Sequence, residues 1–246
     1  MSNIGVSTPH WGYKFSNGLA DLLILDGRTE RSDPFGNDPK MLDEQFDQIE
    51  LFLTEGVGRY KFIVSPVPIA PDTNHDDNFD STKILRNNNS GFHSDTWRAY
   101  PEQRNKLLHI IRNAPGLRPI LLSGDLHVSC MAEIHCTIAD ESELVAVSLV
   151  SSAFNWITFG TQPESKKQFL LRKLEQGVLP EDLSQLAIAP ESRPGSFTVN
   201  IVNQSCPENN YMLIHVSDSS VKAEIFRACD GEIHSQWTID RSVLEK

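Results

Sequence analysis

The chain of 246 residues carries 22 Lys or Arg against 33 Asp or Glu, which gives a formal net charge of −11 at pH 7. A chain of this length can bury a substantial core, so we treat residues 1–246 as a single domain. The negative field repels polyanions, which argues against nucleic acid as a partner.

The sequence contains no membrane or export signal. It has no run of about 18 apolar residues, and its N-terminus lacks a basic region followed by an apolar stretch. We therefore expect a cytoplasmic protein that does not bind a membrane. Cys130, Cys136, Cys206 and Cys229 lack C-x-x-C spacing and are predicted to be reduced thiols, the first two within a strand.

The first part of the chain alternates strand and helix patterns. Residues 13–26 predict a hairpin with Asn17-Gly18 as its turn. A helical face that ends at Gly56 follows, and residues 59–64 predict the next strand. The residues of that helical face are spaced four, three and four apart: Leu42, Phe46, Ile49 and Leu53. Residues 72–94 are polar and are predicted to form a long loop.

A second helix is predicted to begin at Pro101, with Glu102 in its first turn. Its expected buried stripe contains Leu107, Leu108 and Ile111. Strands are then expected at 120–123, 130–138 and 144–151, and an exposed helix at 163–177.

The chain closes with residues 196–240, which read as a meander of short strands with Asp230-Gly231 as a type I′ turn. Strand and helix alternate first, and strands alone follow. This order predicts the α/β class, with helices covering a mixed sheet that packs on a second sheet.

The strand at 120–123 leads into Gly124, Asp125 and His127. If the chain stays extended past Gly124, period-two alternation places Asp125 and His127 on the same side. A carboxylate and a neutral imidazole suit Fe, Zn or Mn, and Gly124 would let the backbone turn sharply there. The alternative is a turn carboxylate beside a hydrogen-bonded histidine.

Five sequence blocks occur in the order and at the approximate spacing of the PhoD-like phosphatases, within the calcineurin-like metallophosphoesterase superfamily. The chain resembles that family through "LLILDGRTERS" (22–32), "DEQFDQIELFL" (43–53), "YKFIVSPVPIAP" (60–71), "SDTWRAYPEQRNKLLHII" (94–111) and "ILLSGDLHVS" (120–129). The resemblance implies a β-sandwich flanked by helices that carries a metal cluster at its strand ends. Family members hydrolyse phosphate mono- or diesters with divalent or trivalent ions, with Fe, Ca, Zn or Mn as candidates here.

The resemblance transfers Asp125 and His127 as metal ligands. Arg28, in the position of the family's Asp-Thr-Arg, is a candidate phosphate contact, and the alternative is a strand-capping ion pair with Asp26. The family's earlier ligand motifs have no counterpart ahead of Leu25, so the chain resembles only the second half of the domain. Pro66 also occupies a position where many relatives place a polar or metal-binding residue.

The remaining candidates each have a structural alternative, which we favour. Trp97, Tyr100 and Arg104 could line a binding site or pack against the start of a helix. His93 and Asp95 could reach a metal or belong to a solvated loop end.

The acidic run at 72–80 lacks the glycine and final glutamate of a calcium-binding EF-hand. Ser123 and Ser129 do not lie in a Gly-x-Ser-x-Gly elbow. The scattered histidines are read as packed or exposed side chains: His10, His109, His135, His215 and His234.

Two hypotheses follow from these patterns. The first is a metal-dependent phosphoric ester hydrolase acting on a small phosphate ester, with further ligands from an N-terminal segment or a separate chain. The second is a non-catalytic binding module derived from that fold. Uncovered sheet edges predict self-association or complementation by such an N-terminal segment.

Overall fold

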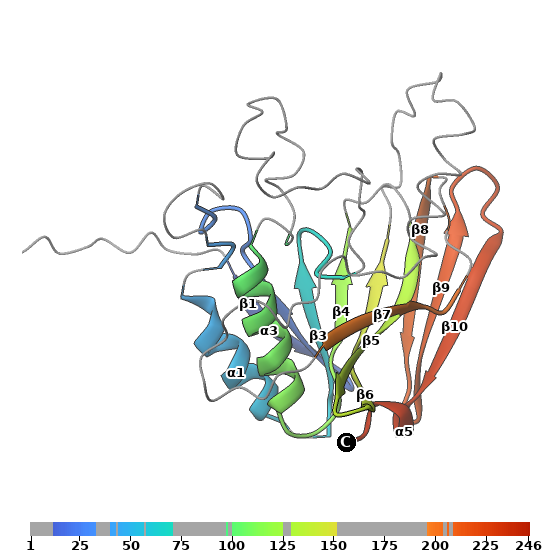
Figure 1. Cartoon of the computed structure of the whole chain (residues 1–246). Coiled ribbons are helices and arrows are strands. Elements are labelled where there is room, and N and C mark those ends of the chain that lie inside the picture. The colour runs from blue at the N-terminus through green and yellow to red at the C-terminus, as the bar shows by residue number, and fades with distance from the viewer. Residues whose placement is uncertain are drawn as a thin grey trace, which may run out of the picture.

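The computed structural model describes residues 12–32, 40–42, 44–56, 58–70, 97, 100–124, 129–151, 196–203, 206 and 209–246. The predicted loop at 72–94 and the predicted helix at 163–177 lie outside these residues. The described elements form three layers: two helices, a seven-stranded sheet and a three-stranded sheet (Figure 1).

The chain begins with the predicted hairpin. Strand β1 (Tyr13–Asn17) pairs antiparallel with β2 (Ala20–Ile24), and Asn17 lies opposite Ala20. The two-residue turn is therefore Gly18-Leu19, one position later than predicted. Gly18 has a φ of 54°, and a glycine adopts this left-handed conformation without a steric penalty.

The two predicted helices are present and bury the expected residues that lie within them. Leu42, predicted on the first helical face, is buried but lies three residues before α1 (Gln45–Thr54) begins. Helix α3 (Pro101–Asn113) begins with proline at its first turn. The four residues of the first stripe and the three of the second are all buried. In the described part of the chain, no helix is long and apolar enough to cross a membrane.

The large sheet also contains β3 (Tyr60–Ser65), β4 (Ile120–Ser123), β5 (Cys130–Ile138), β6 (Glu141–Val150) and β7 (Ser196–Ile201). Its strand order is β1-β2-β3-β4-β6-β5-β7. Neighbouring strands β2, β3, β4 and β6 run parallel, whereas β5 is antiparallel to both β6 and β7. Strand β6 therefore lies between β4 and β5, although β4 and β5 are consecutive in sequence.

The closing meander contains β8 (Asn210–Val216), β9 (Ser220–Arg227) and β10 (Ile233–Asp240), followed by the short helix α5 (Arg241–Leu244). Two details of the prediction were wrong. Strand β7 belongs to the large sheet through its pairing with β5. The β9–β10 connection spans residues 228–232, closed by a hydrogen bond from Arg227 N to Glu232 O (2.9 Å), so Asp230-Gly231 is not a two-residue turn.

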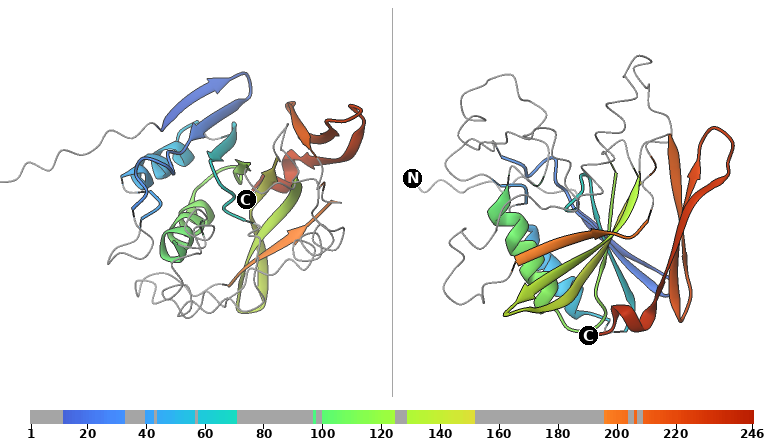
Figure 2. Two further views of the ribbon diagram at one scale, coloured as in Figure 1. Left: turned by 90° about the horizontal axis from the view of Figure 1, so that it is seen from above. Right: turned by 45° about the vertical axis from the view of Figure 1, so that its right-hand side comes forward.

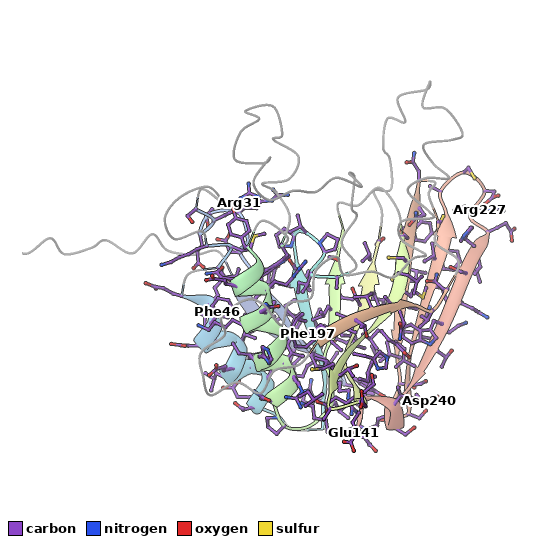
Figure 3. All side chains as sticks on the ribbon, in the orientation of Figure 1. Arg31, Phe46, Glu141, Phe197, Arg227 and Asp240 are labelled. Atoms are coloured by element: carbon purple, nitrogen blue, oxygen red, sulfur yellow. The ribbon has the colours of Figure 1, made fainter. Side chains whose placement is uncertain are left out.

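The large sheet has an apolar core on each face because its residues alternate sides. Ile63 and Leu121 face α1 and α3, together with Phe46 of α1 and Phe197 of β7 (Figure 3). Their neighbours in the strands face β8–β10 and α5 instead: Phe62, Ile120, Val147 and Leu149. Figure 2 shows α1 and α3 on one side of the large sheet and the small sheet with α5 on the other. This confirms the predicted α/β class with a C-terminal antiparallel meander.

All four cysteines are free thiols, as predicted. Cys130 and Cys136 lie in β5, and burial raises the pKa of the Cys130 thiol to about 12. Cys206 is also buried, and Cys229 is exposed. The buried thiols therefore serve as small core side chains rather than reactive groups.

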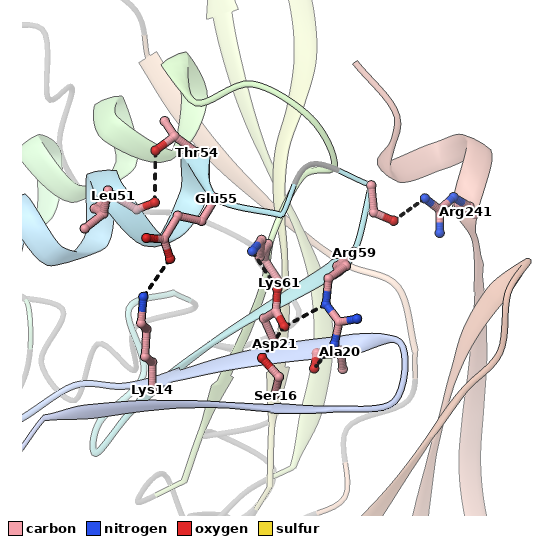
Figure 4. A network of polar contacts seen from close by, with 11 residues as sticks. Lys14, Ser16, Ala20, Asp21, Leu51, Thr54, Glu55, Arg59, Lys61 and Arg241 are labelled. Atoms are coloured by element: carbon pink, nitrogen blue, oxygen red, sulfur yellow. Dashed lines mark hydrogen bonds and ion pairs between the residues drawn. The ribbon is translucent and has the colours of Figure 1, made fainter.

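A buried ion cluster joins the hairpin to β3 at the amino end of the sheet (Figure 4). Asp21 accepts hydrogen bonds from Lys61 Nζ, Arg59 Nε and Ser16 Oγ, each at 2.7 Å. Lys61, with a side chain only 4% exposed, also lies 4.8 Å from the centre of the Phe52 ring. Burial acts to raise the pKa of Asp21, but these three hydrogen bonds outweigh it and lower the pKa to about 2.

Replacing Asp21 by Asn should lower the free energy of unfolding at pH 7 by about 3 kcal/mol, because Lys61 is left buried without its counter-charge. The depressed pKa stabilises the folded state fully above pH 4, and this contribution is lost as the pH falls towards 2. The difference from wild type should therefore shrink over this interval in urea unfolding curves. Asp218→Asn, at an exposed position, is the control. A difference that stays constant down to pH 2 would contradict this account.

Candidate functional site at the carboxyl edge of the sheet

The carboxyl ends of β2, β3, β4 and β6 lie at one edge of the sheet because these strands run parallel. Leu25 N donates to Val64 O (2.9 Å) and Ser151 N donates to Ser123 O (2.9 Å), so the register continues past the strand ends. The arrowheads of β3 and β4 point to this upper edge in Figure 1. Carboxyl ends of parallel strands are the usual place for ligand sites in open α/β sheets.

Asp125 and His127 lie in the segment 125–128, outside the described residues, so the prediction that they share one side remains a prediction. The flanking residues are described. Ser123 and Cys130 both pair with Val150, one on each side of β6. The connection that carries the two predicted ligands therefore begins and ends at the carboxyl edge.

Gly124 opens this connection without the positive φ that a sharp glycine turn would require. Its role is instead to allow a close approach between neighbouring strands. A Cβ atom at this position would lie 3.3 Å from the carbonyl oxygen of Ser151. The absence of a side chain thus lets the end of β4 lie tightly against the end of β6.

The turn after β2 is held by Asp26, which is buried. Its Oδ1 atom accepts hydrogen bonds from the backbone N–H groups of Arg28 (3.1 Å) and Thr29 (2.8 Å), and its Oδ2 atom accepts one from the Thr29 hydroxyl. Asp26 therefore fixes the local backbone by an Asx-type turn. The Arg28 side chain is exposed at the tip of this turn.

Gln45, the first residue of α1, clamps the backbone of the same turn. Asp26 N donates to Gln45 Oε1 (2.8 Å), while Gln45 Nε2 donates to Asp26 O (3.0 Å) and to Glu30 Oε2 (2.7 Å). Gln45 is only 1% exposed, so these bonds form away from solvent. The helix layer thereby sets the position of the turn that presents Arg28.

Pro66 follows β3 and packs against the same turn. A Cβ atom on Gly27 would lie 3.0 Å from Pro66 Cγ and 3.4 Å from Met41 Sδ. The proline thus fills the space beside Gly27. This position contributes packing, not a ligand, to the edge.

Trp97 and Tyr100 belong to the helix-side core, which supports the packing interpretation of this cluster. Trp97 Nε1 donates to Ser65 Oγ (3.1 Å), and Tyr100 OH donates to Ser32 O (2.8 Å). Arg104 is also buried. Trp97 thus contacts the end of β3 and Tyr100 the segment that follows β2, whereas His93 and Asp95 lie outside the described residues.

The described residues do not form a metal site by themselves. Among them, no group of three or more His, Cys, Asp or Glu side chains could hold a metal ion. Both carboxylate oxygens of Asp26 are engaged by its own turn. The predicted ligands Asp125 and His127 and the acidic run at 72–80 are not among the residues described.

Of the scattered histidines predicted to be packed or exposed, His109 packs in the core and His215 is exposed, and His135 and His215 each also lie beside a glutamate. His109 stacks edge-on against Phe197, with ring centres 5.1 Å apart, and burial and then the nearby Arg112 lower its pKa. His135 Nε2 lies 2.9 Å from Glu133 and His215 Nε2 lies 3.0 Å from Glu224. His234 lies on β10, and His10 is outside the described residues.

Sequence reasoning missed Gln45 as a determinant of the edge. One signal was available, because Gln45 lies four residues before Ile49 on the buried face of α1. A polar residue on an apolar helical face indicates a specific buried hydrogen bond. The sequence could not indicate that its partner would be Asp26.

Comparison with known proteins gives three results. The family model of the PhoD-like phosphatase matches residues 13–206. A solved structure of PhoD aligns with a TM-score of 0.58 at 15% identity, covering 94% of this chain and 42% of that chain. A purple acid phosphatase, PPD1 from yellow lupin (Lupinus luteus) seeds, aligns with a TM-score of 0.46 at 14% identity, covering 96% of this chain and 34% of that one. No curated protein sequence matches.

Replacing Gln45 by Ala should lower the free energy of unfolding by about 2 kcal/mol, because the N–H and C=O groups of Asp26 lose their buried partner. Gln48→Ala, the same change at an exposed position of α1, should cost less than about 0.5 kcal/mol. Denaturant unfolding of both variants measures the difference. Equal losses would show that the clamp contributes nothing beyond helix propensity.

Proposed function

The chain belongs to the PhoD-like phosphatase family, and from this premise we propose that it takes part in metal-dependent hydrolysis of phosphate mono- or diesters. The supporting observation is that the family's Gly-Asp-x-His motif falls on the connection flanked by Ser123 and Cys130, at the carboxyl edge. We assign Asp125 and His127 as metal ligands at this edge.

A bound metal ion of this kind would polarise a phosphoryl oxygen and lower the pKa of a water molecule. Two ligands hold an ion poorly, since catalytic sites normally offer at least three protein ligands. The chain spans less than half of the PhoD structure that it matches. We therefore propose that the remaining ligands come from outside the described residues, through a further N-terminal segment or a separate chain.

The contribution of the described residues is to orient the phosphate. Arg28 is exposed at the tip of the turn that Asp26 caps and Gln45 clamps. A guanidinium group donates parallel hydrogen bonds to two phosphate oxygens, and a fixed backbone reduces the entropy lost on binding. The net charge of −11 favours a small phosphate ester over a nucleic acid.

In the protein completed by the segment or separate chain that supplies the remaining ligands, replacing Asp125 or His127 by Ala should abolish stoichiometric binding of Mn²⁺ or Zn²⁺ and reduce hydrolysis of bis(p-nitrophenyl) phosphate by at least about 100-fold. Metal analysis after dialysis and a steady-state assay measure the two effects. His215→Ala is the control, since the turn after its strand lies at the opposite edge, where Tyr60 OH contacts Asp218 O (3.4 Å). Metal content that is unchanged in all three variants would refute the assignment.

Replacing Arg28 by Ala should raise KM, or the inhibition constant of inorganic phosphate, by about tenfold, because one charge-assisted contact is lost. Arg28→Lys should recover part of this loss, since it keeps the charge but not the forked geometry. Arg31→Ala, three residues further on, is the matched control (Figure 3). If Arg28→Ala and Arg31→Ala behave alike, Arg28 does not contact phosphate.

The second candidate is a non-catalytic binding module. In this case Asp125→Ala and His127→Ala would leave stability and partner binding unchanged. Sequencing the DNA upstream of the Met1 codon discriminates the two: an in-frame extension with Asp-x-His and Gly-Asp motifs favours the enzyme, and stop codons favour the module.

A further inference from the structure

Strand β1 forms one edge of the large sheet, and its side chains are uncovered. Among the described strands it pairs only with β2, so its other side presents a row of backbone N–H and C=O groups. All five of its residues are exposed, including Tyr13 (58%) and Phe15 (45%), whose rings stack with centres 6.2 Å apart. An exposed strand edge of this kind is a template for pairing with another extended chain.

The register of the hairpin shows which backbone groups point outward. Its two-residue turn is closed by a hydrogen-bonded pair, Asn17 and Ala20. Hydrogen-bonded and non-hydrogen-bonded pairs alternate along an antiparallel ladder, so Phe15 also exchanges its backbone hydrogen bonds with β2. Lys14 and Ser16 therefore direct their N–H and C=O groups away from β2, towards the open edge.

One face of β1 carries its polar side chains, and these have partners within the chain (Figure 4). Lys14 Nζ lies 2.6 Å from Glu55 Oε2 at the end of α1, and Ser16 Oγ donates to Asp21 (2.7 Å). Lys14 and Asp21 are the only charged residues in the range 13–24. Both are held in ion pairs, so a second copy can approach this edge without meeting an unpaired like charge, although the whole chain carries −11.

The other face of the hairpin is apolar. Tyr13 lies opposite Ile24, and Phe15 lies opposite Leu22. Leu22 packs against the core between the two sheets, so this apolar strip is continuous with the interior. Unpaired edge strands are usually protected by a bulge, a proline or a charge. Strand β10, an edge of the small sheet, has a register shift at its start, whereas β1 has an unbroken register and no such protection on its apolar face.

We propose that two copies of this chain associate by antiparallel pairing of β1 with the partner's β1. A two-fold axis beside Phe15 places Lys14 opposite the partner's Ser16, and these are the residues whose backbone groups point outward. Phe15 then lies opposite the partner's Phe15 in a non-hydrogen-bonded pair, where side chains approach most closely. The contact is self-complementary and closes after two copies, as a two-fold interface does.

The match of β1 with itself favours a second copy as the occupant of this edge. Every outward N–H and C=O group of Lys14 and Ser16 finds a partner in the paired strands, and the aromatic rings of both copies lie on the same face. A single strand pair buries less than the roughly 1,600 Å² of a standard interface, so the dimer should dissociate at micromolar concentrations. This association does not depend on the proposed hydrolysis.

Sedimentation velocity of the full chain, over a concentration series from the low micromolar to the submillimolar range, tests the proposal. The sedimenting mass should approach twice the 27.6 kDa of one chain as the concentration rises. Phe15→Lys and Phe15→Glu each place like charges opposite one another across the axis, so each should weaken association at least about tenfold. An equimolar mixture of the two variants should recover association, because the opposed charges are then complementary.

Leu213→Lys is the matched control, because Leu213 has the same exposure (44%) but lies on β8 of the small sheet. It should leave the dissociation constant within about twofold of wild type. Tyr13→Lys, at a still more exposed position of the same strip, provides the test if a Phe15 variant does not fold. The proposal is overturned if the wild type stays monomeric throughout, as it would if another segment covered β1, or if Leu213→Lys weakens association as much as Phe15→Lys. A mixture of the Lys and Glu variants that remains monomeric would overturn the two-fold pairing.

Discussion

Four neighbouring strands, β2, β3, β4 and β6, share one direction, and the placement of the candidate site depends on this parallel pairing. Because they are parallel and in register, their carboxyl ends lie at one edge of the sheet. The insertion of β6 between β4 and β5 then places both ends of the 125–128 segment beside Val150.

The edge is supported from both layers that cover the sheet. On the helix side, Gln45 and Trp97 bond to the ends of β2 and β3. On the side of the small sheet, Asn203 and Asn210 bond to the beginning of β5. Each contact is buried or partly buried, and each joins segments far apart in sequence. The opposite, amino edge is held by the Asp21 ion cluster. Ion pairs therefore stabilise one edge of the sheet, and hydrogen bonds between neutral groups stabilise the other.

Local patterns predicted local structure well in this chain. The hairpin, the buried stripes of α1 and α3, and the strand at 120–123 follow from periodicity, capping residues and turn residues. The exact turns did not follow, because Gly18 and Gly231 mark a turn without fixing which neighbours complete it. The pairing of strands distant in sequence could not be predicted, because nothing in residues 196–201 indicates that β7 pairs with β5.

The site was predictable only in part, for the same physical reason. Gly-Asp-x-His could be read as a ligand pair from its residue types and spacing, and its position after β4 was expected. The clamp of Gln45 on Asp26 and the bond of Ser129 to Asn210 depend on tertiary contacts that no local pattern encodes. Pro66 could be recognised as unable to bind a metal, but its packing against Gly27 required coordinates.

The central claim is that Asp125 and His127 reach one cation at the carboxyl edge. A crystal structure of the chain together with the segment or separate chain that supplies the remaining ligands, soaked in Zn²⁺ and analysed with anomalous difference maps, tests it most directly. The account predicts a peak at about 2.0–2.3 Å from the Asp125 carboxylate and from a His127 ring nitrogen. Side chains of Asp125 and His127 on opposite faces of the sheet, or both enclosed by apolar neighbours with no anomalous peak, would contradict it.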